Sequence, residues 1–134
     1  MAEMVVDTDV LSFGFRQDPL FVQFYGPVLQ GNLAIISFMT VAELELGMRL
    51  RNWGQNRMHN LRAYLASHFV EYGVSKRVCQ SWAELTHEAR TQGRVLSTAD
   101  GWIAATAVAL NAPLVTHNSK DFSSLSGLSV VTAP

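Results

Sequence analysis

The sequence is short of charge. Only 16% of its 134 residues are Asp, Glu, Lys or Arg, against about 25% in a typical globular protein, while 49% are hydrophobic. This composition excludes intrinsic disorder and predicts a surface partly covered by a partner or by a second copy of the chain. Ten basic residues against eleven acidic ones give a net charge of −1. Global charge therefore gives no sign of a general nucleic-acid binder.

Cysteines, membrane spans and linkers are also scarce or missing. The single cysteine, Cys79, cannot form an internal disulfide, which fits a reducing cytoplasm. No apolar run reaches the 18 residues or so of a membrane helix, and Glu3 and Asp7 interrupt the N-terminal apolar run, so we expect no signal peptide. No repeat and no Pro-, Gly- or Ser-rich linker divides the chain. We therefore expect one domain over residues 1–134.

Short apolar runs alternate along the chain with helical stretches. Strong stop signals, Gly93 and Pro113, follow the last two helical stretches. The alternation predicts an α/β fold, a three-layer α/β/α sandwich with a central, mostly parallel sheet of about five strands. In such sheets ligands gather beyond the carboxyl ends of the strands. The expected strands lie near 4–6, 33–36, 69–74, 113–116 and 128–131, and the expected helices near 19–30, 40–52, 56–67, 75–92 and 99–111.

Three acids stand near expected strand or helix ends. Asp7 directly follows the first strand, and Asp121 follows the fourth strand by a short loop. Asp100 opens a helix that is apolar almost all round, where a carboxylate is costly unless it is paired or bound to a metal. Each has a structural alternative: Asp7 and Asp100 suit helix caps, and Asp121 suits a solvated loop beside Lys120.

Glu43 differs from Glu45, its neighbour on the same expected helix. Glu45 has Arg49 four residues later, the favourable order for an exposed ion pair. Glu43 has Gly47 at that spacing, so a surface ion pair does not explain it. The alternative for Glu43 is a capping box that begins at Thr40.

Taken together, the four acids Asp7, Glu43, Asp100 and Asp121 predict a metal site. No Lys or Arg is spaced to neutralise the first three locally. Carboxylates brought together without basic partners repel and raise one another's pKa. Hard divalent cations remove that conflict, and oxygen ligands suit Mg²⁺ or Mn²⁺. A carboxylate-bound metal pair is an arrangement that cleaves phosphodiesters in line.

Four ordered motifs carry a resemblance to a known family. They are Val5-Val6-Asp7-Thr8-Asp9-Val10-Leu11, Ile36-Ser37 with Thr40-Val41-Ala42-Glu43-Leu44, Asp100-Gly101-Trp102-Ile103-Ala104-Ala105-Thr106-Ala107, and Leu114-Val115-Thr116-His117-Asn118-Ser119-Lys120-Asp121-Phe122. With these motifs the chain resembles, over nearly its whole length, the PIN-domain ribonucleases of the VapC toxin type.

The resemblance implies an activity and a set of partners. It implies a Mg²⁺- or Mn²⁺-dependent endoribonuclease with Asp7, Glu43, Asp100 and Asp121 as metal ligands, although Asn118 competes with Asp121 for the fourth position. Thr116 and Asn118 are then supporting polar groups. The metals would orient and deprotonate a water that attacks phosphorus, leaving 5′-phosphate and 3′-hydroxyl ends. The resemblance also implies a VapB-like antitoxin that blocks the groove, a homodimer, and tRNA as a family-level substrate.

Two other groups of residues have open interpretations. Four arginines fall within fourteen positions: Arg49, Arg51, Arg57 and Arg62. They are interpreted either as parts of solvated helix faces or as a rim beside Glu43 that contacts phosphates. The histidines show no metal-ligand spacing, although substrate contact by His117 is an alternative to a purely structural role.

Two rival functions remain at this point. The Asp7-Thr8-Asp9 segment also resembles the opening of haloacid-dehalogenase-like phosphatases, in which the first Asp is a nucleophile. That chemistry needs a later Lys followed by an acidic pair, which is missing after Lys120. The second rival is a non-catalytic PIN-like binding scaffold, which has no need for four unpaired carboxylates.

Overall fold

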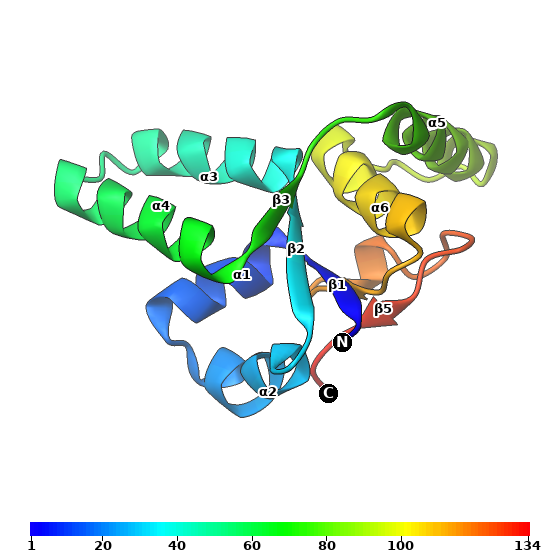
Figure 1. The fold of residues 1–134 in the computed structure, drawn as a ribbon. Helices are drawn as coiled ribbons and strands as arrows, with labels where there is room; N and C mark the ends of the chain where they lie inside the picture. The colour runs from blue at the N-terminus through cyan, green and yellow to red at the C-terminus, as the bar shows by residue number, and fades with distance from the viewer.

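The strands of the protein form one fully parallel sheet. The computed structural model describes all residues, Met1–Pro134, and its five strands are arranged in the order β3-β2-β1-β4-β5. Figure 1 shows α5 and α6 on one side of the strands and α1 to α4 on the other. The expected α/β sandwich with a five-stranded parallel sheet is confirmed. The strands are β1 (Glu3–Val6), β2 (Leu33–Ser37), β3 (Val70–Tyr72), β4 (Leu114–Val115) and β5 (Val130–Val131).

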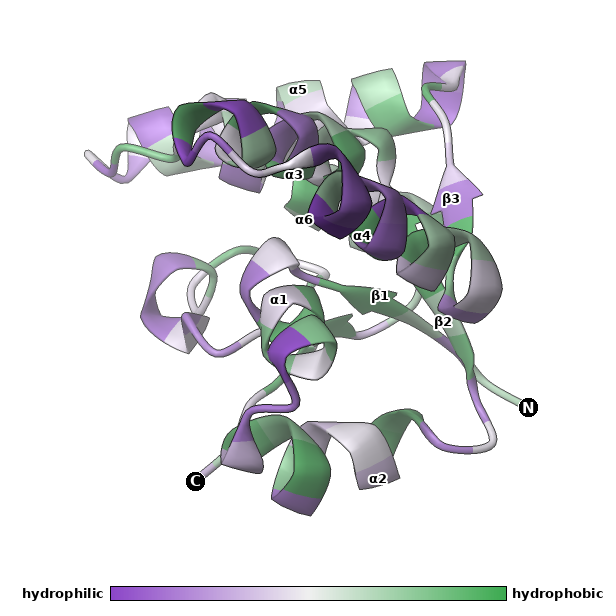
Figure 2. Cartoon of the chain, turned by 90° about the vertical axis from the view of Figure 1, so that its left-hand side faces the viewer, coloured by the Kyte–Doolittle hydropathy of each residue, from purple (hydrophilic) through white to green (hydrophobic).

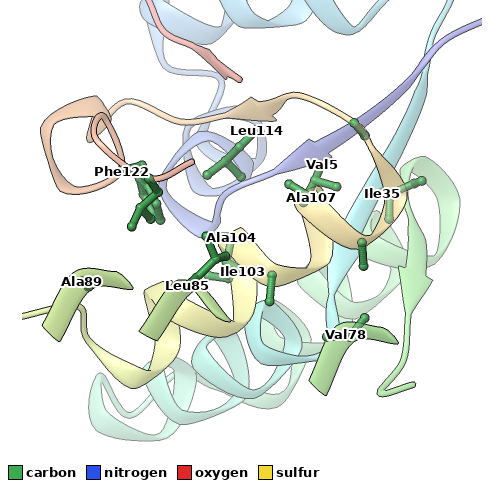
Figure 3. Close-up of a cluster of buried hydrophobic side chains, with 14 residues drawn as sticks. Val5, Ile35, Val78, Leu85, Ala89, Ile103, Ala104, Ala107, Leu114 and Phe122 are labelled. Carbon is green, nitrogen blue, oxygen red and sulfur yellow. The ribbon is translucent and has the colours of Figure 1, made fainter. Parts of the chain in front are cut away.

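Alternating strand residues supply the two cores of the sandwich. Val5 packs with α5 and α6 on one face of the sheet, whereas its neighbour Val6 packs with α1, α3 and α4 on the other. Successive strand side chains point to opposite faces, so continuous apolar runs are what a sheet covered on both sides requires. Figure 3 shows the first of these cores, in which Ile103, Ala104 and Ala107 of α6 lie against the sheet.

The register brings three strand ends to one edge. Val5 pairs with Ile35 of β2, and Val6 pairs with Val115 of β4. The residues that follow β1 and β4, and Ser37 at the end of β2, therefore lie at the same carboxyl edge. The N-termini of α1 and α3 begin there too.

Most expected helices occur within two residues of their predicted bounds, but one was missed. No helix was expected before residue 19, and the structure has α1 directly after β1. Asp7 caps α1, and Gln17 ends it in the left-handed conformation at φ 55°. Nine residues are too few for a strong periodic signal. The helices are α1 (Thr8–Arg16), α2 (Gly26–Leu29), α3 (Phe38–Leu50), α4 (Gln55–His68), α5 (Lys76–Thr91) and α6 (Thr98–Leu110).

The expected helix 19–30 is not one regular α-helix. Phe21–Tyr25 forms a π-helical turn, labelled η1, which runs into the short α2. Pro27 lies in the first turn of α2 and has no N–H to donate to the carbonyl four residues earlier, so the regular ladder is interrupted there.

Some boundaries differ from the expected ones. The helix expected at 40–52 begins at Phe38, because the Ser37 side chain accepts a hydrogen bond from the Met39 N–H and caps α3. The strands expected at 69–74, 113–116 and 128–131 shorten to two or three residues each. No helix is long and apolar enough to cross a membrane.

Candidate active site

The carboxyl edge of the sheet gathers the acids that the sequence singled out. Asp7 follows β1, Glu43 lies on α3, Asp100 lies in the first turn of α6, and Asp121 ends the short 3₁₀ turn η2 (Ser119–Asp121) after β4. The charges of Glu43 and Asp121 act on Asp100, and the charge of Asp100 acts on Asp7, so the four acids lie within electrostatic reach of one another. Their role as metal ligands stays a prediction.

Asp7 is the most buried of the four acids. The residue is only 6% exposed to solvent. One carboxylate oxygen accepts from the Thr8 N–H at 2.7 Å, and the other accepts from the Thr116 hydroxyl at 2.7 Å. Burial, followed by the charge of Asp9, raises the pKa of Asp7 from 3.8 to about 7. Asp7 therefore does cap α1, but its buried carboxylate is costly to ionise.

Asp9 belongs to the same site, and the sequence argument missed it as a site residue. Its carboxylate accepts from the N–H groups of Val10 at 2.7 Å and His117 at 3.2 Å. Burial raises its pKa, against the lowering effect of these hydrogen bonds. Its position two residues after Asp7, in the same motif, was the available signal.

Glu43 is linked to the residues after β1 by hydroxyl contacts, which residue spacing along the sequence did not predict. The Thr8 hydroxyl donates to the Glu43 carboxylate at 2.7 Å and lies 3.1 Å from the hydroxyl of Thr40. Thr40 is buried inside α3, and the cap is Ser37. The alternative of a capping box from Thr40 to Glu43 is therefore wrong.

Glu45 has the surface role expected from its spacing. Its carboxylate pairs with Arg49 at 2.9 Å, as predicted, and also with Arg62 of α4 at 2.9 Å. The Arg62 hydrogen bonds, followed by those of Arg49, lower the pKa of Glu45 to about 2. These are the two salt bridges of the chain, so none reaches the acids of the site.

The loop after β4 holds Asp121 in place through polar neighbours. The Asn118 amide donates to the Asp121 carboxylate, and the Asn118 N–H donates to the Thr116 hydroxyl at 3.1 Å. Since that hydroxyl donates to Asp7, a chain of hydrogen bonds links the loop to the centre of the site. Arg94 contacts the backbone carbonyl of Asp121 at 3.2 Å rather than its carboxylate.

The acids interact electrostatically across the site. Burial raises the pKa of Asp100, the nearby Ser97 hydroxyl lowers it, and the charges of Asp121, Glu43 and Asp9 raise it further. The charge of Asp100 in turn raises the pKa of Asp7. As the side chains lie in this structure, no three of His, Cys, Asp or Glu are close enough together to hold a metal ion directly. The site is thus a repelling set of carboxylates without basic partners.

His117 is held in one orientation at the rim of the site. Tyr25, which is fully buried, lies with its hydroxyl 2.7 Å from His117 Nδ1 and accepts from the Ala133 N–H at 3.0 Å. The sequence left a structural role and substrate contact open for His117. The contact with Tyr25 fits the structural role, and substrate contact stays a prediction.

A groove of about 610 Å³ begins at the site. It includes Thr8 and Glu43 and runs between α1 and the paired helices α3 and α4; Figure 2 shows these helices side by side above α1. The four arginines grouped in the sequence divide here. Arg49 and Arg62 pair with Glu45, whereas Arg51 and Arg57 line the groove.

This fold and site define an α/β/α protein with an acidic centre at the carboxyl edge of a parallel sheet. The model of the PIN domain family matches residues 4–128, and the chain belongs to the PIN domain family.

Named relatives agree with that family. The chain is 28% identical over 127 residues to Ribonuclease VapC1 of Haemophilus influenzae strain R2866, which covers 92% of each chain. It is 30% identical over 136 residues to the VapC ribonuclease Y4jK of Sinorhizobium fredii, covering 96% of this chain and 95% of the relative. These similarities do not favour the phosphatase alternative.

Solved structures share the fold over nearly the whole chain. VapBC-1 from nontypeable Haemophilus influenzae matches with a TM-score of 0.77 at 25% identity, covering 98% of each chain. VapBC2 from Rickettsia felis, bound to a DNA fragment of its promoter, matches with a TM-score of 0.88 at 22% identity, covering 98% of this chain and 99% of that one. The second likeness is one of fold.

Proposed function

We propose that the protein is a divalent-metal-dependent endoribonuclease, the toxin of a VapBC-type toxin–antitoxin pair. The observation that carries the proposal is the repelling set of carboxylates at the carboxyl edge of the sheet, in a chain similar to VapC ribonucleases over nearly its whole length. A binding scaffold has no use for such an arrangement, because it only destabilises the fold.

The chemistry of the donor set fits Mg²⁺ or Mn²⁺. Asp7, Glu43, Asp100 and Asp121 offer only hard oxygen ligands, and no cation of the chain neutralises them. Mg²⁺ usually keeps several of its waters and takes only one or two carboxylates directly. Direct convergence of three side chains, which the structure lacks, is therefore not required. When bound, the metal supplies a nucleophile at neutral pH and stabilises charge on the phosphate.

The protein's own residues prepare this site in three ways. Thr116 and the Thr8 N–H hold both oxygens of Asp7, and the Thr8 hydroxyl holds Glu43, so both carboxylates are oriented before substrate arrives. Asn118 holds Asp121. Preorganised groups of this kind lower the reorganisation needed during reaction.

The partners follow from the same relatives. We propose a VapB-like antitoxin as the cognate partner, since the similar structures are of VapBC complexes. A homodimer as the functional unit is proposed from the resemblance of the sequence motifs to VapC toxins alone. We place the protein in the cytoplasm, where its exposed cysteine, Cys79, stays reduced. An RNA is the substrate, with tRNA as the class to try first.

The proposal is tested by incubating purified protein with a mixed tRNA pool. We expect no cleavage in chelator and cleavage on addition of Mg²⁺ or Mn²⁺, with 5′-phosphate ends on the products. The same preparation of Asp100→Asn protein controls for contaminating nuclease. Cleavage that persists in chelator, or an RNA left intact with every divalent metal while the purified protein is folded, would overturn the proposal.

A further inference from the structure

We propose that Arg51, Arg57 and Arg16 bind the phosphates of the RNA strand beside the cleavage point, in the groove that begins at Glu43. This inference rests on the proposed ribonuclease activity and assigns residues that position its substrate. All three arginines line the groove, together with Glu43 and Thr8 of the acidic site.

Gly47 makes room for Arg51 within the groove. Gly47 lies one turn after Glu43 on α3, and Arg51 lies one turn after Gly47, so the three share one face of the helix. A Cβ atom built on Gly47 would stand 2.7 Å from the nearest guanidinium nitrogen of Arg51. The Arg51 side chain therefore folds back along α3 over Gly47, which places its charge on the same helix face as Glu43.

Aromatic rings hold the other two guanidinium groups. Arg57, near the start of α4, lies over the ring of Trp53 at 3.9 Å from its centroid, a cation–π contact. Trp53 in turn stacks on Phe15 of α1. Arg16 lies over the ring of Phe13 at 5.5 Å. These contacts orient the guanidinium groups without neutralising their charge.

None of the three arginines has an acidic partner. The salt bridges of the chain both involve Glu45, and they occupy Arg49 and Arg62. Glu45 thus neutralises Arg49 and Arg62, whereas the groove arginines keep a charge that is available to a ligand. With a net charge of −1, the protein needs such a local positive surface to attract a polyanion toward a cluster of acids.

Continuity with the acidic site favours RNA as the occupant of this groove. The groove that includes Glu43 also includes the three free guanidinium groups. A strand that lies along this groove from Glu43 would therefore meet their positive charges. Planar guanidinium groups match phosphate oxygens in geometry and charge. Leu46 and Leu50, which are exposed on the groove wall, offer the alternative of an amphipathic protein helix, which the experiment below separates from RNA.

The test is the binding of a labelled single-stranded RNA to the protein in chelator, so that no cleavage occurs. We expect Arg51→Ala and Arg57→Ala each to weaken binding several-fold. Each should also reduce the slope of log affinity against log salt by about 0.7, the value for one lost phosphate contact on a single strand. The matched controls are Arg49→Ala and Arg62→Ala, which should leave the salt slope unchanged.

A second variant separates positioning from folding. Gly47→Ala puts a methyl group where the Arg51 guanidinium lies, and it also replaces Gly by a better helix former. We expect this variant to lose RNA affinity while its Tm stays the same or rises, which a merely structural role of Gly47 would not produce.

Several outcomes would overturn the inference. If Arg51→Ala and Arg57→Ala bind RNA like the wild type, while the wild type cleaves RNA with divalent metal, the groove assignment fails and the proposed function stands. If these variants keep RNA affinity but lose affinity for a co-purified antitoxin, the groove belongs to a protein partner. A wild type that neither binds nor cleaves RNA overturns both.

Discussion

Asp7 and Glu45 show how placement decides the state of a single carboxylate. Asp7 lies buried beside Asp9, and its pKa rises to about 7; Glu45 lies between two arginines at the surface, and its pKa falls to about 2. Spacing along the helix was enough to predict the Glu45 pair. The burial of Asp7 depends on β4 and the loop after it, which lie beside the end of β1. Spacing along the sequence therefore could not predict the high cost of ionising Asp7.

The contrast between Glu43 and Glu45 gives the first prediction. Glu43→Gln should remove most RNA cleavage, because Glu43 belongs to the acidic site. Glu45→Gln should keep activity and lose only its surface ion pairs, of which the i,i+4 pair with Arg49 contributes about 0.2–0.5 kcal/mol. Initial cleavage rates and thermal unfolding of the two variants measure this. Equal loss of activity in both would mean that Glu43 has no special role in the site.

Asp121 and Asn118 give a second prediction. Asp121 carries a charge that reaches Asp100, whereas Asn118 is neutral and orients Asp121 through its amide. Asp121→Asn should therefore raise the Mg²⁺ or Mn²⁺ concentration for half-maximal cleavage more than Asn118→Ala does. Asn118→Ala should mainly lower the rate at saturating metal.

A metal titration of both variants decides between the two residues. If Asn118→Ala shows the larger shift in metal requirement, Asn118 is the fourth ligand, and Asp121 is a loop acid.

The sequence located Asp7, Glu43, Asp100 and Asp121 but missed the groups that orient them. Strand ends and helix starts can be found from apolar runs, and acids at those places are conspicuous. The Thr8 contact with Glu43 joins residues 35 positions apart, and the Asp9 contact with His117 joins residues 108 apart. Contacts at such separations depend on sheet register, which periodicity does not reveal.

At the scale of elements, α1 decides the shape of the site. It begins at the end of β1, covers one face of the sheet, and forms one wall of the groove. The sequence predicted the longer helices well, because their apolar periodicity and stop signals extend over several turns. It missed α1, which is short, and misplaced the start of α3, where Ser37 rather than Thr40 provides the cap.

Gly14 gives a third prediction, at this scale. A Cβ atom at Gly14 would stand 2.5 Å from the Tyr64 hydroxyl and 2.8 Å from the Phe21 ring, so α1 packs tightly against α4 and η1. Gly14→Ala should destabilise the protein by about 1–3 kcal/mol through overpacking.

Thermal unfolding measures this effect, with Gly73→Ala as the control, because nothing lies within 4 Å of a Cβ at Gly73. A Gly14→Ala variant as stable as the wild type would contradict the tight packing of α1.

At the scale of the whole molecule, the parallel sheet brings together residues from both ends of the sequence. β1 and β4 are neighbours, so Asp7 and Thr116 meet although they lie 109 positions apart. The alternation of strands and helices predicted a parallel sheet, and the rule that ligands gather at its carboxyl edge predicted the region of the site. The strand order itself came from the structure.

Asp7 also predicts a pH dependence of stability for the metal-free protein. Its folded pKa of about 7 lies above the ordinary 3.8, so folding favours its protonated form. The resulting destabilisation is absent below about pH 4, grows as the pH rises, and is complete above pH 7. With about 1.4 kcal/mol for each pKa unit, a few kcal/mol are at stake.

We therefore expect the Tm in chelator to fall between pH 5 and pH 8, and Asp7→Asn to flatten that fall and to raise the Tm at pH 8. Glu45→Gln is the control, because a pKa lowered to about 2 does not titrate in this range. A wild type whose Tm does not change between pH 5 and pH 8, or an Asp7→Asn variant with the same fall, would contradict the burial of this charge.

The central claim is that the carboxylates at the edge of the sheet form a divalent-cation site that cleaves RNA. Its most direct test is the cleavage rate of Asp7→Asn and Asp100→Asn proteins across a full Mn²⁺ titration, each variant first shown to be folded by its thermal transition. The account predicts that wild-type cleavage rises from zero with Mn²⁺, while neither variant cleaves at any concentration and both unfold at or above the wild-type Tm without metal. Cleavage by either variant at the wild-type rate would contradict it.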